Sequence, residues 1–435
     1  MWKWINLLLT PLIKSSTDQL SRYPVGPKCK TRIRPSMKHE SLHESRPQLM
    51  RELNFLSQLY ARDAAGSSLL AEYPSSNSDQ TCFQNKTKFH IHDPFPPPAR
   101  ELIKVLGPHH LMCGWGRELP VASEIQPSCQ LLEHWEDLLG AEAVPVWQAA
   151  PSAEVERYIT LFPHESLSPE QQVIDPVVNY ELHSKHVIEQ IDCPQAEVLD
   201  GVKIPCVAKL THGYAGLGNF MIRSDEDHAA MREQVQQQWP DAQVVVNSMI
   251  ENIVDDYGVQ FYLRPDGSTV WLGLTEQNFN QEQRWCGGVY RSELQQSQFE
   301  ALVPFVEATA QHLSERGYHG VVGIDVVRSK DGNQYLVDVN PRLTGISPFL
   351  MASRMFDRDQ GLEFGAYRAS CQYQGDLKQL ITAAQSAWND DGVKVLVLSA
   401  FETVAENGAP ATICHLSASA IALEPCQAKL DQLIG

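Results

Sequence analysis

The sequence predicts an α/β protein of two or three domains. The chain has 435 residues, which exceeds a typical domain of roughly 100 to 200 residues. Hydrophobic residues make up 43% of it and charged residues 20%, as in ordinary globular proteins. Runs of strand character alternate with helical stretches along the chain. These observations exclude a single small module, a collagen and a coiled coil.

Net charge and cysteine usage narrow the class of protein. The formal charge of −18 argues against nucleic acid as a partner, because neutralising phosphates requires clustered Lys and Arg. The ten cysteines form no C-x-x-C pair, so we expect reduced thiols. No stretch of the sequence approaches the roughly 18 consecutive apolar residues of a membrane-spanning helix. We therefore predict a cytoplasmic protein with no nucleic-acid partner.

Residues 1–60 are predicted to be a basic leader and a first helix, partly flexible. Up to Arg51 the chain carries ten Lys and Arg residues against three acidic ones. Such a leader could contact an anionic membrane surface or act as a targeting segment. The alternative, which we favour, is a mobile arm. A helical stripe follows at Leu49, Leu53, Leu56 and Tyr60.

Residues 61–168 are predicted to form a modest α/β domain. It begins with a linker-like stretch over residues 64–81, and consecutive prolines break the chain again at residues 93–98. Apolar periodicity then predicts a helix near residues 100–106, a strand over 109–116, a helix over 130–139 and short strands near 143–147.

Residues 169–370 are predicted to form a larger unit of two lobes, 169–250 and 251–370. In the first lobe a helix begins at the N-cap Ser224, with three acidic residues in its first turn. The second lobe is rich in strands. Residues 371–435 are predicted to be a small C-terminal α/β segment. The expected elements are strands at 206–210, 220–223, 242–250 and 393–401, a hairpin about 265–267, and helices over 225–239 and 299–313.

A hairpin near the end of the second lobe carries the first chemical signal. If Asp331 and Gly332 form its turn, counting back along both strands places Asp325 opposite Asp338. Asn340 then lies on the same face as Asp338, with Gly323 opposite it and space in front. The other face is predicted to be the core side, with Val322, Ile324, Val326, Tyr335, Val337 and Val339.

Two carboxylates directly opposite each other on neighbouring strands repel and destabilise the sheet, so we expect a cation between them. Carboxylate and amide oxygens without Cys or His favour Mg²⁺, with Mn²⁺ as the other candidate. Asp325, Asp338 and Asn340 are therefore the predicted metal ligands. In the alternative, the pairing slips by one residue and one acid is an ordinary surface charge.

A glycine-rich loop carries the second signal. Gly213, Gly216 and Gly218 lie between two predicted strands, which excludes a P-loop and a dinucleotide fingerprint. Such a loop can fold over phosphates, because missing side chains let backbone N–H groups approach the oxygens. Lys209 stands on the strand that enters the loop, where an anion would explain a charge. A flexible surface hairpin is the alternative.

Taken together, these motifs resemble the ATP-grasp superfamily, which includes D-alanine:D-alanine ligase and biotin carboxylase. The resemblance covers roughly residues 169–348. It includes Lys185 before the glycine loop, a hinge segment at residues 244–252, and the acidic hairpin that ends in Asn340-Pro341-Arg342. It implies an ATP-grasp fold, preceded here by a Rossmann-like domain.

The resemblance also implies roles for particular residues. Lys185 and Lys209 would contact the phosphates or the adenine of ATP, and the glycine loop would close over the γ-phosphate. Arg342 would face the transferred phosphoryl group as the catalytic residue. The adenine hinge and the ribose site would be formed by Ser248, Met249, Ile250, Glu251 and Asp255 or Asp256.

The implied activity is that of an ATP-dependent ligase. A carboxylate would be phosphorylated by ATP and Mg²⁺, and an amine would then displace phosphate from the acyl phosphate. Amino acids or small peptides are the expected substrates, and a homodimer is a candidate assembly. Two alternatives stay open: a nucleotide-binding regulator without activity, and a kinase on the same fold.

Two further motifs are weaker. Arg284 and Arg291 stand in a predicted polar loop over residues 275–293 and could clamp a substrate carboxylate. As the alternative, both are solvated. His90 and His92 have the alternate spacing that places two imidazoles on one strand face, but no third metal ligand accompanies them.

Overall fold

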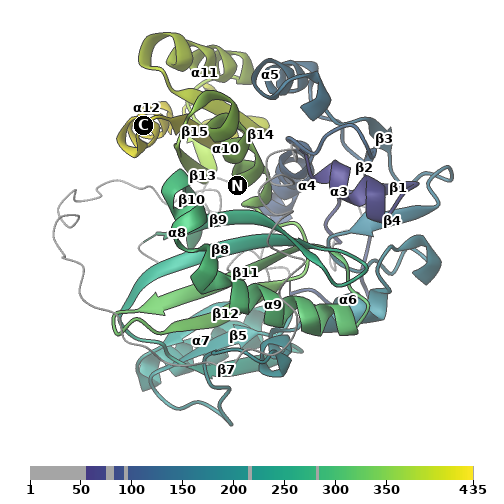
Figure 1. The fold of residues 1–435 in the computed structure, drawn as a ribbon, viewed down its shortest axis with the longest axis vertical. Coiled ribbons are helices and arrows are strands. Elements are labelled where there is room, and N and C mark those ends of the chain that lie inside the picture. Colours follow the sequence, from purple (N-terminus) through teal and green to yellow (C-terminus); the bar gives the residue numbers. More distant parts are fainter. Residues whose placement is uncertain (1–54, 75–82, 93–96, 214–217, 281–283, 435) are drawn as a thin grey trace.

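Three β-sheets and the helices that pack on them make up the structure (Figure 1). This computed structural model describes residues 55–74, 83–92, 97–213, 218–280 and 284–434. The fold is mixed α/β, with one parallel sheet and one large antiparallel sheet, as the sequence predicted. Most of the predicted leader lies outside the described residues. Among the described helices, none is long and apolar enough to cross a membrane.

The first sheet is parallel and has the strand order β3-β2-β1-β4. A parallel sheet needs helical crossovers, and the described helices α4 and α5 lie between its strands in the chain. Its elements are α3 (Leu56–Asp63), β1 (Ser67–Leu70), α4 (Pro97–Met112), β2 (Val121–Ser123), α5 (Cys129–Leu139), η1 (Ala141–Ala143), β3 (Trp147–Ala149) and β4 (Arg157–Thr160).

Two predictions for this region are wrong. The expected linker over residues 64–81 contains β1, a strand near the centre of the sheet, with all four residues buried. A strand buried on both faces shows no polar alternation, so its short sequence is hard to tell from a loop. The expected strand over 109–116 begins in the last turn of α4, which continues through Gly107 and Pro108. The prolines and glycine suggested an earlier helix end.

The second sheet is small and antiparallel, with the order β6-β5-β7. Helix α7 packs on it through Met231 and begins where predicted, with the Ser224 hydroxyl accepting a hydrogen bond from the Asp227 N–H. The elements of this lobe are η2 (Pro169–Gln171), α6 (Pro176–Leu182), η3 (Lys185–Gln190), β5 (Cys206–Leu210), β6 (Asn219–Ile222), α7 (Asp225–Gln238) and β7 (Val244–Ser248).

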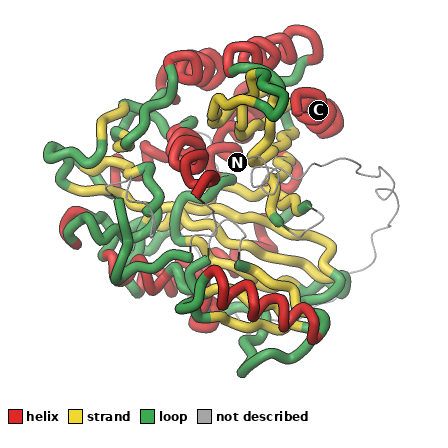
Figure 2. The backbone as a smooth tube through the Cα atoms, turned by 180° about the vertical axis from the view of Figure 1, so that it is seen from behind, coloured by secondary structure: helices red, strands yellow, loops and turns green. Residues whose placement is uncertain are grey.

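The third sheet has eight strands in the order β12-β11-β8-β9-β10-β13-β15-β14 and runs through the middle of the molecule (Figures 1 and 2). Its elements up to α10 are β8 (Ile253–Leu263), β9 (Thr269–Phe279), β10 (Trp285–Arg291), α8 (Ser292–Ser297), α9 (Phe299–Glu315), β11 (Gly320–Ser329), β12 (Gln334–Asn340) and α10 (Ser347–Gln360). Residues 275–293, predicted as a polar loop, are mostly β9 and β10. Polar residues occur on these strands because one face of the sheet here lines the candidate site, where Gln277 of β9 contacts Asp325.

The C-terminal residues extend this same sheet. They form β13 (Phe364–Tyr373), α11 (Leu377–Asp391), β14 (Lys394–Val404), β15 (Pro410–Ala420) and α12 (Leu423–Ile434). The predicted strand at 393–401 is therefore present as β14 and the small helix expected near the end of the chain as α12, and the strands β13 and β15 and the helix α11 are additions. The hydrophobic core is continuous from α3 to α12.

Helix α5 ties the parallel sheet's region to the far edge of the large sheet. The Trp135 indole N–H donates to the Val397 carbonyl at 2.8 Å, and His134 Nε2 accepts from the Val397 N–H at 3.0 Å. Both side chains are buried. Both backbone polar groups of Val397, on the edge strand β14, thus have partners on the helix.

This contact predicts that Trp135→Phe destabilises the whole chain. The Val397 carbonyl would stay buried without its donor, a cost of roughly 1–3 kcal/mol in the free energy of unfolding. Urea denaturation followed by far-UV circular dichroism measures it. Trp388→Phe, at a half-exposed residue, is the matched control and should cost clearly less. Equal losses in the two variants would contradict this role for Trp135.

Candidate active site

The β11–β12 hairpin places two carboxylates opposite each other. Asp325 pairs with Asp338, and Gly323 pairs with Asn340, as the sequence predicted. The space expected in front of Asn340 is filled, because the Thr344 side chain packs there. A Cβ at position 323 would lie 2.9 Å from Thr344 Cγ2. Gly323 is therefore required by a close approach.

The turn of the hairpin differs from the predicted two-residue form. Lys330, Asp331 and Gly332 form a three-residue loop, because the Ser329 N–H bonds to the Asn333 carbonyl. Gly332 has a φ of 87°, as the last position of such a loop requires. Counted from this turn alone, the pairing would be shifted by one residue from the predicted pairing.

A β-bulge in β12 restores the pairing of the acids. Val326 pairs with Leu336 and Asp325 with Asp338, so Val337 is an extra residue in β12. Because of the bulge, Leu336 is fully buried, and Tyr335 and Val337 are only partly buried. The prediction that Tyr335 and Val337 belong to the core was therefore wrong, and Leu336 takes that place.

Two lysines of the small lobe contact the bulged strand. Lys209 on β5 donates to the Val337 carbonyl at 2.6 Å, and Lys185 at the start of η3 donates to Asp338 Oδ1 at 2.6 Å. The Lys185 side chain is only 9% exposed. The backbone of Lys185 also bonds to the Thr211 carbonyl, next to the glycine loop. The two predicted phosphate-binding lysines and the acid pair therefore lie together.

The acids of this cluster respond differently to their surroundings. Burial raises the pKa of Asp325, and the neighbouring Asp338 and Asp256 raise it further. Burial opposes ionisation of Asp338 too, but Lys185 and Lys209 hold its pKa below the usual range. Burial raises the pKa of Asp256 on β8 to about 7, against the effect of Lys209. The pKa of Asp325 is thus raised and that of Asp338 lowered, and a cation between the two carboxylates would favour the ionised form of both.

A chain of hydrogen bonds links Asp338 to Arg342. Asn340 Nδ2 donates to Asp338 Oδ2 at 3.3 Å, and Arg342 Nη2 donates to Asn340 Oδ1 at 3.2 Å. Gln277 on β9, a residue the sequence did not single out, donates to Asp325 Oδ1 at 2.7 Å. The amides of Gln277 and Asn340 thereby orient the two carboxylates.

The donor set of this cluster fits a Mg²⁺ ion. Asp325, Asp338 and Asn340 offer hard oxygen ligands on one face of the hairpin. Among the described residues, no group of three or more His, Cys, Asp and Glu side chains is placed to hold a metal. Two carboxylates and an amide leave positions for water and phosphate oxygens, as Mg²⁺ in nucleotide sites requires.

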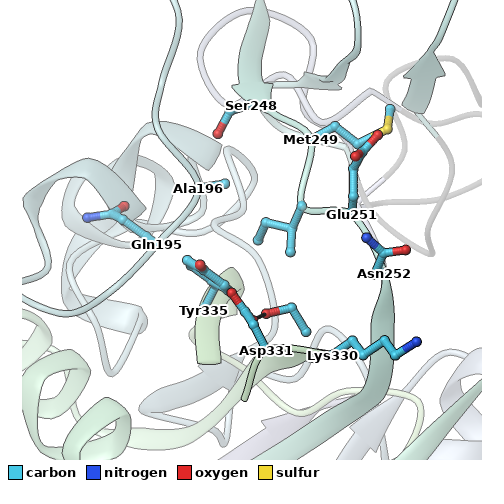
Figure 3. A pocket seen from close by; sticks show the side chains of 11 residues that line it. Gln195, Ala196, Ser248, Met249, Glu251, Asn252, Lys330, Asp331 and Tyr335 are labelled. Carbon is cyan, nitrogen blue, oxygen red and sulfur yellow. Dashed lines mark hydrogen bonds between the residues drawn. The ribbon is translucent and has the colours of Figure 1, made fainter. Parts of the chain in front are cut away.

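A pocket of about 570 Å³ lies at the turn end of the same hairpin, between the hinge after β7 and the turn. Figure 3 shows hinge residues Met249 and Glu251 across the pocket from Asp331 and Tyr335. The predicted hinge residues Ser248, Met249, Ile250 and Glu251 all line it. Asp256 does not line it but lies on β8 opposite Val327, near Lys209. The pocket has the size of a small-molecule site.

The glycine loop lies between β5 and β6. Gly213 pairs with His92, whose N–H bonds to the His212 carbonyl, so residues before position 93 hold the start of the loop. Gly218 has a φ of 91°, and a Cβ there would lie 2.7 Å from Leu210 Cδ1. Gly216, the third predicted residue, lies outside the described residues.

The weaker candidates are placed as follows. Arg291 pairs with Glu276 on the neighbouring strand at 2.6 Å. Arg284 precedes β10 and donates its backbone N–H to the Asn280 side chain. His90 and His92 belong to no metal-binding group among the described residues. None of the four contacts the acid pair in a hydrogen bond that the structure shows.

Comparison with known families identifies the domain that carries this site. Residues 185–340 match the family model described as "L-aspartate--L-methionine ligase, ATP grasp". The matched range begins at Lys185 and ends at Asn340, so it spans the lysines, the hinge and the acid pair. Residues 185–340 therefore form an ATP-grasp domain, as predicted. No curated protein sequence matches the chain.

Several solved structures are similar to the chain at low identity. An L-amino acid ligase from Bacillus licheniformis is 14% identical, with 72% of this chain and 91% of that chain covered and a TM-score of 0.45. An N5-carboxyaminoimidazole ribonucleotide synthetase in complex with ADP is 13% identical, with 75% of this chain and 93% of that chain covered and a TM-score of 0.47. Biotin carboxylase from Campylobacter jejuni is 12% identical, with 70% of this chain and 87% of that chain covered and a TM-score of 0.45.

The bulge predicts a sharp effect of deleting Val337. Without the extra residue, Asp338 still lies opposite Asp325, but the Val337 carbonyl that accepts from Lys209 is lost, and Lys209 loses its anchor on β12. Affinity for ATP in the presence of Mg²⁺ should fall by more than about tenfold, as isothermal titration would measure. Val337→Ala keeps the bulge and is the control, with affinity close to the parent's. Unchanged affinity after the deletion would contradict the role of the bulge.

The raised pKa of Asp256 predicts a pH-dependent stability. The folded chain keeps this proton up to about pH 7, whereas an unfolded Asp loses it near pH 4, so stability without ligands falls as pH rises between these values. Asp256→Asn should flatten that fall in melting temperature between pH 5 and 7, measured by differential scanning fluorimetry. Asp241→Asn, at an exposed residue, should leave it unchanged. Parallel curves for Asp256→Asn and the parent would refute the assignment.

Proposed function

We propose that the protein is an ATP-dependent ligase that joins a carboxylate to an amine through an acyl phosphate and releases ADP and phosphate. The observation that carries this proposal is the charge cluster of the hairpin. Asp325, Asp338 and Asn340 stand on one sheet face, with Lys185 and Lys209 on one side and Arg342 on the other. This cluster lies in an ATP-grasp domain that matches a ligase family.

ATP and Mg²⁺, or Mn²⁺ in its place, are the cofactors of this proposal. The adenosine occupies the pocket of about 570 Å³ along the hinge, with Ser248, Met249, Ile250 and Glu251. Lys185 and Lys209 bind phosphate oxygens, and Gly213, Gly216 and Gly218 cover the γ-phosphate with backbone N–H groups. Asp325, Asp338 and Asn340 hold the metal ion, which neutralises phosphate charge when bound. Asp256 is a neighbour of Lys209 and acts on the bound nucleotide through the charge of that lysine.

The first chemical step transfers a phosphoryl group. An oxygen of the substrate carboxylate attacks the γ-phosphorus, the bond to the β–γ bridging oxygen breaks, and ADP leaves with the electron pair. Arg342 stabilises the charge that spreads over the phosphoryl oxygens. Its Nε lies buried without a hydrogen-bond partner among the described residues, and a buried N–H of this kind calls for an acceptor.

The second step forms the C–N bond. A neutral amine attacks the carbonyl carbon of the acyl phosphate, phosphate leaves, and the nitrogen loses a proton. Arg342 acts in both steps, because the phosphoryl group that it stabilises during the first step is the leaving group of the second step. The amide product then dissociates with ADP and phosphate.

Amino acids are the substrates we propose for both positions. The matched family model is that of a ligase named for L-aspartate and L-methionine, which supports amino acids as the substrate class of this proposal. Small peptides remain in the same substrate class.

We further propose that the domain boundaries follow residues 168 and 370, as predicted from the sequence. The acid and the amine would then bind between the parallel sheet and the large sheet.

Two other functions on the same fold make different predictions. A nucleotide-binding regulator without activity does not need the acid pair, Asn340, Arg342 and both lysines together. A kinase would give a stable phosphorylated product and no free phosphate. The complete charge cluster favours catalysis, and the ligase family match favours C–N bond formation over kinase activity.

A screen of paired amino acids tests the proposal. With ATP, Mg²⁺ and the correct acid and amine, the protein should release ADP and phosphate in equal amounts, followed by a coupled phosphate assay and mass spectrometry of the product. Chelation of Mg²⁺ should abolish release. Asp338→Asn should lower the rate by at least about 100-fold, because loss of one electrostatic group in such sites costs that much.

Asp390→Asn, at an exposed residue of α11, is the matched control and should keep the parental rate. A phosphorylated acid that accumulates without free phosphate would identify a kinase instead. No phosphate release over a full panel of amino-acid pairs, together with unchanged ATP binding in Asp338→Asn, would contradict the ligase proposal.

A further inference from the structure

The guanidinium of Arg342 lies against an aromatic ring from outside the ATP-grasp domain. Its Cζ is 4.9 Å from the centroid of the Phe162 ring. Phe162 is 3% exposed, and its ring also packs on Tyr73 at 6.1 Å and on His183 at 4.8 Å. Burial lowers the pKa of Arg342, so this cation has lost much of its hydration. A ring face in contact with a desolvated cation is a stabilising arrangement.

The position of Phe162 follows from the parallel sheet. β4 ends at Thr160 and β1 ends at Leu70, and the two strands are neighbours in the sheet. Phe162 and Tyr73 therefore follow the carboxyl ends of adjacent parallel strands. In open α/β sheets this edge is where ligands bind. Here the edge presents aromatic side chains to the arginine of the other domain.

The remaining contacts of Arg342 leave one edge of its fork without a protein acceptor. Nη1 donates to the Leu343 carbonyl at 3.0 Å and Nη2 to Asn340 Oδ1 at 3.2 Å. Nε is buried and has no hydrogen-bond partner within the described part of the chain. An acidic residue in place of the ring would occupy this fork bidentately and neutralise it. A ring holds the plane of the guanidinium and leaves both the charge and the N–H groups available.

We infer that Phe162 is a positioning residue for the reaction: its ring face holds the Arg342 guanidinium so that the unpartnered N–H edge meets an oxyanion. This inference rests on the proposed function, because that oxyanion is the transferred phosphoryl group. It also assigns a role to the parallel sheet, which supplies an arginine-positioning ring as well as a wall of the site. Tyr73 also packs on the Phe162 ring, in a tilted contact.

Fluorinated phenylalanines at position 162 test the inference without removing the ring. One, two and three fluorine atoms weaken the negative ring face stepwise and change its size little. The rate of phosphate release at saturating substrates should fall stepwise, by about three- to tenfold in all, which is the range expected for a buried cation–π contact. The KM for ATP should stay unchanged. The same series at Phe89, a buried ring that packs on Tyr180, is the matched control and should be flat.

A second readout does not depend on activity. In a double-mutant cycle of Phe162→Leu and Arg342→Met, the unfolding constants of ligand-free protein should show coupling, so that the double variant is less destabilised than the two single changes multiplied together. A parent protein without phosphate release would refute the proposed function and leave this cycle to decide the contact. A flat fluorine series with parental rates, or a cycle without coupling, would overturn the inference.

Discussion

Two carboxylates that face each other across one hairpin are the constraint on which the rest of the structure depends. Directly opposed acids in a sheet repel, and burial makes the repulsion stronger because water no longer screens it. The structure offsets this cost from β9 of the same sheet and from the small lobe. Lys185 contacts Asp338, Lys209 contacts the Val337 carbonyl of β12, and Gln277 donates a hydrogen bond that orients Asp325. A hairpin of this kind has a physical reason to exist only if a cation uses it.

The bulge at Val337 is the feature that makes the arrangement possible. The three-residue turn would by itself pair the strands in a register that separates the two acids onto opposite faces. One extra residue in β12 corrects this and turns the Val337 carbonyl toward Lys209. A single irregularity thus sets the face of Asp338 and anchors the small lobe, which agrees with the frequent occurrence of bulges beside active sites.

The hinge, the residues just after β12 and the edge of the parallel sheet lie at different positions along this hairpin. The hinge pocket lies toward the turn, at Asp331 and Tyr335, and Arg342 lies just past the other end of β12. The hinge pocket and Arg342 therefore lie toward opposite ends of β12. At the Arg342 end, Phe162 contacts the guanidinium and Tyr73 packs on Phe162, and both aromatic residues follow the carboxyl edge of the parallel sheet.

The sequence predicted the parts of the site that depend on local pattern. Asp325 and Asp338 were found opposite each other, and β5, β6 and α7 were located, because the hairpin turn, the strands and the helix each have a turn signal, an apolar pattern or a cap of their own. The correct pairing of the acids came from a turn that was wrong by one residue and a bulge that was not foreseen. No local rule distinguishes a bulged Val337 from its neighbours in an alternating strand.

The residues that sequence reasoning missed act through distant contacts. Gln277 is 48 positions from Asp325, and Phe162 comes from a different sheet than Arg342. Neither residue stands in a motif, so only the folded structure brings them to the site. The strand β1 was missed for another reason: burial on both faces removes the polar alternation by which strands are recognised.

Transfer of oxygen from the substrate carboxylate to phosphate is the measurement that tests the account most directly. The acid found in the screen would be labelled with ¹⁸O in both carboxylate oxygens and converted with ATP and the amine, and the released phosphate would be analysed by mass spectrometry. An acyl phosphate predicts one ¹⁸O atom in each phosphate released, with the other retained in the amide. Phosphate without ¹⁸O would contradict an acyl phosphate, and with it the role assigned to the acid pair and Arg342.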